Sequence, residues 1–133
     1  MKPARQLKLH DPDNGVLGSC WATCIAMVLG LDPEDVPNFV ESDDWWGVTT
    51  AWLEARGYTL IEVRGDAVMV PAEGAVLIAS GPSPRDVQHS VVDVWTQGHW
   101  VEYDPHPSDA GLLERQTFSM VVRHLNYGTQ DAE

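Results

Sequence analysis

The sequence predicts an α+β domain in which two N-terminal helices pack on an antiparallel sheet of about five strands. Apolar residues follow a helical spacing before Gly57 and alternate with a period of two after it. Helices followed by a run of strands are typical of α+β proteins with an antiparallel sheet. A chain of 133 residues with 44% apolar content encloses one core, so we expect residues 1–133 to form a single domain.

The first predicted helix begins at Cys20 and ends before Gly30, because glycine commonly occupies the position after a helix. Only Thr23 is plainly polar within it. A helix that is apolar nearly all round is buried, so we expect this one in the core. Asp32 before Pro33 then predicts the cap and first position of one short helical turn.

The second predicted helix lies in the segment DDWWGVTTAWLEARGY and stops at Gly57. Trp45, Val48 and Trp52 follow helical spacing, with Leu53 beside them, which predicts that these residues face the core together. Trp45 and Trp46 are adjacent and cannot both face that core. One of them is therefore expected to line a cleft or to cover the start of the helix.

Five segments with the alternation typical of strands follow, separated by clusters of Gly, Pro and Asp. They are YTLIEVR (58–64), AVLIAS (75–80), HSVVDVW (89–95), HWVEYD (99–104) and QTFSMVVRHL (116–125). Only TQG separates the third strand from the fourth, which forces a hairpin. If its turn spans Trp95 to Gly98, His89 lies opposite Asp104, whereas a slip of one residue places Pro105 there.

The acidic balance of the chain disfavours several classes of partner. Asp and Glu number 20 against 8 Lys and Arg, so the average field repels phosphate backbones and anionic lipid headgroups. We therefore expect neither nucleic acid nor a membrane as partner. The N-terminus lacks the apolar core of a signal peptide and the apolar runs are too short to span a membrane, which predicts a cytoplasmic protein.

Cys20, His89 and Asp104 are the residues with which this chain could perform thiol chemistry. A nucleophilic cysteine must be held as thiolate, a histidine must accept and return a proton, and a third group must orient that histidine. In the first turn of a helix, the dipole is expected to lower the pKa of Cys20, and the backbone N–H groups there can bind an oxyanion. Alternatively, Cys20 is a small core residue, as free cysteines commonly are.

The second cysteine, Cys24, lies four residues after Cys20 and is expected to be a core residue. A disulfide between them needs unusual geometry, so both are predicted to be free thiols. A zinc site that combines them with two histidines lacks the paired-ligand spacing typical of zinc. No metal or other cofactor is therefore expected.

Three further residues are candidates for substrate binding. Arg85, in the segment GPSPRD, either binds a substrate carboxylate or is a surface arginine in a turn. His106 either contacts substrate, takes the place of Asp104, or lies in a solvated loop. Trp21, directly after Cys20, is the third candidate.

The segment GSCWA at 18–22 resembles the nucleophile signature of the papain-like cysteine peptidases. The segment HSVVDVWTQGHWVEYDPHP is similar to the His-strand, turn and DP segment of bacteriocin-processing peptidases, the compact cytoplasmic branch of that superfamily. Small domains encoded by bacteriophages are similar too, with SPR before the histidine and DPHPS after it. The resemblance implies that Cys20 is the nucleophile, His89 the general base and acid, and Asp104 the orienting residue.

In that superfamily a side-chain amide six residues before the nucleophile helps to form the oxyanion hole, which implies this role for Asn14. Leu17 stands where papain itself has a second cysteine, and His89 follows Cys20 too closely for the full-length papain fold, so a minimal version is implied. The implied activity is acyl transfer, most simply hydrolysis of a peptide, isopeptide or related amide bond in a peptide or protein substrate. A transamidase would use the same three residues.

A function of a different class is a binding protein that keeps the fold without using the thiol. A phage-encoded inhibitor or antagonist of a host factor is one example. The presence of Cys20, His89 and Asp104 together argues against this alternative, because a degenerate enzyme has no chemical reason to retain all three.

Overall fold

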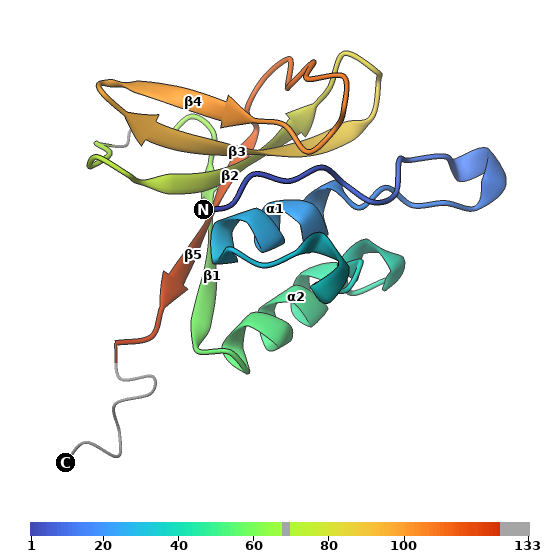
Figure 1. The fold of residues 1–133 in the computed structure, drawn as a ribbon, viewed down its shortest axis with the longest axis horizontal. Coiled ribbons are helices and arrows are strands. Elements are labelled where there is room, and N and C mark those ends of the chain that lie inside the picture. The colour runs from blue at the N-terminus through green and yellow to red at the C-terminus, as the bar shows by residue number, and fades with distance from the viewer. Residues whose placement is uncertain (68–69, 126–133) are drawn as a thin grey trace.

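The structure, a computed structural model, describes residues 1–67 and 70–125 and confirms the α+β class. Its elements are η1 (Pro12–Asn14), α1 (Cys20–Leu29), η2 (Pro33–Asp35), η3 (Phe39–Glu41), α2 (Trp45–Glu54), β1 (Tyr58–Arg64), β2 (Val76–Pro82), β3 (Gln88–Thr96), β4 (His99–Tyr103) and β5 (Thr117–Arg123). The strands form one antiparallel sheet in the order β1-β5-β2-β3-β4. Both helices lie against the same face of that sheet (Figure 1).

The buried first helix is confirmed, with the predicted start and end. Gly30 follows α1 in the left-handed conformation, with φ 73°, and its N–H bonds back to carbonyls of the last turn. Every residue from Trp21 to Met27 is buried, and α1 packs mainly on β3. This packing brings the first residue of α1, Cys20, to one end of β3.

α2 places part of the predicted face, Trp52 and Leu53, against the core and leaves the other part exposed. Trp45 and Val48 are 39% and 40% exposed, whereas Thr49 and Leu53 are fully buried. A threonine can occupy the core face here because its hydroxyl accepts the indole N–H of Trp21 at 3.0 Å and donates to the Trp45 carbonyl at 2.6 Å. Trp45 is therefore the tryptophan of the adjacent pair that faces outward.

The β3–β4 hairpin turns at Gln97 and Gly98, one residue later than predicted. Both residues have positive φ, 51° and 82°, as a type I′ turn requires. The predicted turn would have placed β-branched Thr96 in that conformation, which is sterically costly. Thr96 instead pairs with His99, so the register differs by two residues from the prediction and every side chain keeps its predicted face.

The second face of the sheet carries a smaller apolar cluster of Leu77, Ala79, Val91 and Phe118. The chain between β4 and β5 runs over this face. Gly81 allows its close approach, because a Cβ there would lie 2.1 Å from the carbonyl oxygen of Glu114.

Among the described helices, none has the length and apolar content needed to cross a membrane.

The N-terminal segment is fixed to the loop that follows β4, about a hundred positions later in the chain (Figure 1). Arg5 forms a 2.6 Å ion pair with Asp109 and also donates to two backbone carbonyls of that loop. The N–H of Gln6 donates to the carbonyl of Pro105 at 2.9 Å. These bonds place Gln6 beside the same end of β3 that α1 approaches.

Candidate active site

Cys20 is held at the start of α1 by the residue before it. Ser19 is buried, its N–H donates to the carbonyl of Lys8, and its hydroxyl accepts the N–H of Lys8 at 3.0 Å. The start of the helix is thereby tied to the N-terminal segment. The side chain of Cys20 is partly buried and lines two adjoining hollows of about 630 and 440 Å³.

Burial raises the pKa of the Cys20 thiol above its ordinary value. Hydrogen bonds from the backbone N–H groups of Ser90, Trp21 and Cys20 itself oppose this rise only in part. The direction is opposite to the one predicted from the position of Cys20 in the helix. The prediction considered the N–H groups of the helix. It did not include the cost of removing the thiolate from water where β3 packs on the start of α1.

His89 and Asp104 form a buried pair. The Nε2–H of His89 donates to Oδ1 of Asp104 at 2.6 Å, and the two residues are 4% and 7% exposed. The β3–β4 register, if continued past Tyr103, would place Asp104 opposite Val91, so its contact with His89 is diagonal rather than direct. The pairing follows because the shift of two residues keeps Asp104 on the face that His89 occupies.

The Asp104 carboxylate accepts two further hydrogen bonds. The N–H of His106 donates to Oδ1 at 2.9 Å, and the N–H of Gly111 donates to Oδ2 at 2.8 Å. Burial alone would raise the pKa of Asp104, but the hydrogen bonds from His89 and from these two N–H groups outweigh it and lower the pKa. Asp104 is therefore ionised at neutral pH and fixes the orientation of the His89 ring.

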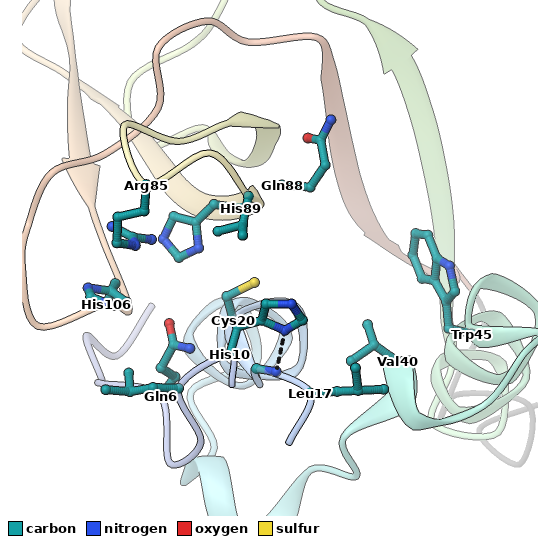
Figure 2. Close-up of a pocket in the computed structure, with 13 residues that line it drawn as sticks. Gln6, His10, Leu17, Cys20, Val40, Trp45, Arg85, Gln88, His89 and His106 are labelled. Atoms are coloured by element: carbon teal, nitrogen blue, oxygen red, sulfur yellow. Dashed lines mark hydrogen bonds between the residues drawn. The ribbon is translucent and has the colours of Figure 1, made fainter. Parts of the chain in front are cut away.

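Cys20 and His89 lie on opposite walls of the larger hollow, which Figure 2 shows with Arg85 and His106 at one end and Trp45 at the other. Both also line the smaller hollow. No hydrogen bond joins the two side chains, each of which belongs to the described part of the chain. Because Nε2 of His89 is bonded to Asp104, Nδ1 is the nitrogen left to accept a proton.

The structure does not bring Asn14 to this site. Asn14 is exposed in η1, its amide donates to Asp11 at 2.7 Å, and it lines neither hollow. Two side-chain amides line the larger hollow, that of Gln88, which donates to Gln116 at 3.2 Å, and that of Gln6 on the Cys20 side (Figure 2). For Gln6, Nε2 donates to the carbonyl of Lys8, and Oε1 is buried without a hydrogen-bond partner among the described residues.

Gln6 was not among the residues singled out from the sequence. Its place depends on the bond between its N–H and Pro105 and on the neighbouring pair of Arg5 with Asp109. Both contacts join segments at opposite ends of the chain. The one signal in the sequence was the glutamine itself, an amide ahead of the candidate nucleophile.

The three candidates for substrate binding have different surroundings. Arg85 and His106 line the larger hollow, and the rings of His106 and His89 meet edge-on with centroids 6.1 Å apart. Trp21 is 4% exposed and mainly a core residue, although it contributes to the wall of the smaller hollow. Arg85 and His106 therefore share the larger hollow with Cys20 and His89, whereas Trp21 does not line it.

Cys24 is fully buried one turn after Cys20, and burial raises the pKa of its thiol well above the ordinary value. Both cysteines are free thiols, as predicted. Among residues 1–67 and 70–125, no three His, Cys, Asp or Glu side chains are grouped so that they could hold a metal ion.

Comparisons with protein-family models, with curated proteins and with solved structures return no match to this chain.

Proposed function

We propose that this chain is a cysteine-dependent acyl transferase with water as the default acceptor, which hydrolyses a peptide, isopeptide or related amide bond. The observation that carries the proposal is the buried His89–Asp104 pair beside Cys20 in one hollow. Burying an ionised carboxylate against an imidazole is costly unless it is fully hydrogen-bonded, as Asp104 is here. Such a pair orients a histidine toward a nucleophile.

In the proposed reaction, Sγ of Cys20 attacks the substrate carbonyl carbon while its proton passes to Nδ1 of His89. The C–N bond then breaks, His89 returns the proton to the leaving amine, and a thioester remains on Cys20. Water, deprotonated by His89, attacks the thioester carbon, and the C–S bond breaks to release the acid and restore the thiol. An amine in place of water would make the reaction a transamidation.

The raised pKa of Cys20 decides how the thiol is activated. The resting thiol is protonated at neutral pH, so His89 acts as a general base during the attack and no thiolate–imidazolium pair forms beforehand. The N–H groups of Cys20 and Trp21 at the start of α1 are the donors available to a substrate oxyanion. Gln6 supplies a side-chain amide to the larger hollow, whereas Asn14 lines neither hollow.

The proposal also places the chain with the papain-like cysteine peptidases, in a minimal form. The support is the GSCWA segment at the start of a buried helix, with a histidine on a strand packed against it and an aspartate after the next strand. The order of the three residues along the chain is the one that the resemblance implies.

Hydrolysis of p-nitrophenyl acetate tests the proposal, because this activated ester needs no specific substrate site. Release of p-nitrophenol should be abolished in Cys20→Ala and retained in the matched control Cys24→Ala, which removes the same atoms one helical turn away. His89→Ala should lower the rate by on the order of 10²-fold or more, the usual contribution of a general base. Equal rates in Cys20→Ala and the unmodified protein would refute the proposal.

A non-catalytic binding protein is the second candidate function. The raised pKa of Cys20 and the lack of a hydrogen bond between Cys20 and His89 within the described chain favour it. In that case Cys20→Ala and His89→Ala would release p-nitrophenol no more slowly than the unmodified protein. The same experiment therefore separates the two candidates.

A further inference from the structure

The larger hollow differs from the rest of the molecule in the charge of the side chains that line it. The chain carries 20 Asp and Glu, yet none of them lines this hollow, whereas Arg85 and three histidines do. The histidines are His10, His89 and His106. In a molecule of formal net charge −12, a wall of this composition points to a ligand that carries negative charge.

Arg85 is available to such a ligand. Five of the other cationic side chains form ion pairs, namely Lys2, Arg5, Lys8, Arg64 and Arg115. Arg85 instead donates to a hydroxyl, that of Ser108, at 3.0 Å, and no carboxylate in the described part of the chain forms an ion pair with it. Asp104 and Asp109, the carboxylates of the neighbouring loop, are bonded to His89 and Arg5.

The turn between β2 and β3 fixes the backbone at Arg85. Ser83 and Val87 close it through a backbone hydrogen bond of 2.9 Å, and the N–H of Asp86 donates to the carbonyl of Ser83. Asp86 adopts a positive φ of 62°, and the N–H of Arg85 bonds to the Ser83 hydroxyl. The backbone of Arg85 is thus held by hydrogen bonds within the turn, and its side chain lies beside His89 (Figure 2).

His106 supplies a second donor at the same end. The N–H of Ser108 donates to its Nδ1 at 3.0 Å, so the neutral ring carries its proton on Nε2. Burial lowers the pKa of His106, and so does repulsion from the neighbouring Arg85 guanidinium. An anion bound between them would relieve that repulsion.

We propose that the substrate of this site carries a carboxylate, which binds to Arg85 and His106 beside Cys20. The inference rests on the proposed function, since it names the substrate class for that site. The opposite end of the hollow is lined by the apolar side chains of Leu17, Val40 and Trp45 (Figure 2). The carboxylate is therefore recognised at one end, and an apolar group of the substrate fits the other.

Alkylation of Cys20 by iodoacetate and by iodoacetamide tests this inference. In both reactions the Sγ–C bond forms, the C–I bond breaks and iodide leaves, so the reagents differ only in a carboxylate against an amide. The ratio of the two rates at one pH cancels the thiolate fraction. The acidic molecule repels iodoacetate on average, so a ratio about tenfold above that of the unfolded chain would be due to a charge-assisted hydrogen bond.

Arg85→Gln should lower this ratio to that of the unfolded chain, and Arg85→Lys should retain part of it, because lysine keeps the charge but not the planar donor fork. Arg123→Gln is the matched control, since it removes the same charge at the exposed far end of β5 and should leave the ratio unchanged. Circular dichroism and melting temperatures establish that each variant folds. An unchanged ratio in a folded Arg85→Gln variant would overturn the inference.

The outcome is separable from that of the proposed function. If Cys20 transfers no acyl group but the ratio falls in Arg85→Gln, the anion site stands and catalysis is refuted. If p-nitrophenyl acetate is hydrolysed through Cys20 but the ratio does not respond to Arg85→Gln or Arg85→Lys, catalysis stands and the carboxylate inference is refuted.

Discussion

The His89 ring donates a 2.6 Å hydrogen bond to Asp104, although Asp104 lies two positions from the point directly opposite His89 in the β3–β4 register. The N–H groups of His106 and Gly111 hold the carboxylate in this diagonal position. Gly111 has φ 69°, and a Cβ there would lie 2.4 Å from Oε1 of Glu102, whose other carboxylate oxygen, Oε2, accepts a hydrogen bond from Arg115. The loop after β4 is thus shaped around the Asp104 side chain.

Asp104 should make the stability of the fold depend on acid pH. The pKa of Asp104 is lowered in the folded state, so the ionised carboxylate stabilises the fold at pH values above the pKa of the unfolded state. This contribution is lost as the pH falls through the lowered folded-state pKa. The melting temperature of the unmodified protein should therefore exceed that of Asp104→Asn by a constant margin above about pH 5. The margin should shrink toward pH 2, and a margin independent of pH would contradict the assigned hydrogen bonds.

Alkylation of Cys20 should require alkaline pH. Because burial raises the pKa of its thiol, the midpoint of iodoacetamide labelling should lie above the ordinary thiol value of about 8.5. Cys24 should remain unlabelled until the protein unfolds, since it is fully buried. Peptide mapping after labelling across a pH series measures both. A Cys20 midpoint below pH 7 would show a preformed thiolate and would refute general-base activation.

Gln6→Ala should slow p-nitrophenyl acetate hydrolysis by roughly tenfold, the effect of losing one hydrogen bond of about 1.4 kcal/mol. Asn14→Ala is the matched control because it removes an amide that lies in η1, outside both hollows. It should leave the rate unchanged. The reverse result, loss in Asn14→Ala alone, would restore the oxyanion role that the sequence resemblance implied for Asn14.

Arg115→Met should destabilise the fold by about 3–5 kcal/mol, because it leaves a buried carboxylate unpaired. Arg115 donates to Asp93 at 2.7 Å and to Glu102 at 2.7 Å, and Asp93 is 1% exposed. Arg64→Met is the control, since its pair with Asp66 is largely exposed and should cost at most about 1 kcal/mol. Urea denaturation measures both, and equal losses would contradict the buried pair.

Local patterns in the sequence were sufficient for the secondary structure. The start of α1 at Cys20 and its end before Gly30 depend on residues within the helix, and so do the alternating strands. The predicted register of the β3–β4 hairpin was wrong because the alternation of the flanking strands does not locate the turn. The positive φ values of the turn fall at Gln97 and Gly98, which sets the register. The error was two residues in register, so every side chain kept its predicted face of the sheet. His89 and Asp104 therefore still lie on the same face and pair.

Long-range contacts account for what the sequence did not predict. Asn14 was chosen by its spacing from Cys20, but the path of the N-terminal segment is set by Arg5 and Asp109 at opposite ends of the chain. The raised pKa of Cys20 likewise depends on β3 covering the thiol, which no local pattern encodes. Spacing along the chain therefore predicted the helix end on which Cys20 lies, but not its surroundings.

The measurement that tests the central claim most directly is mass spectrometry of the protein quenched in acid after brief reaction with p-nitrophenyl acetate. We expect one acetyl group, mapped to Cys20, that disappears with time as water hydrolyses the thioester. In His89→Ala the acetyl group should form and disappear far more slowly. An acetyl group found only on lysines, or one on Cys20 that forms equally fast in His89→Ala, would contradict catalysis by Cys20 and His89.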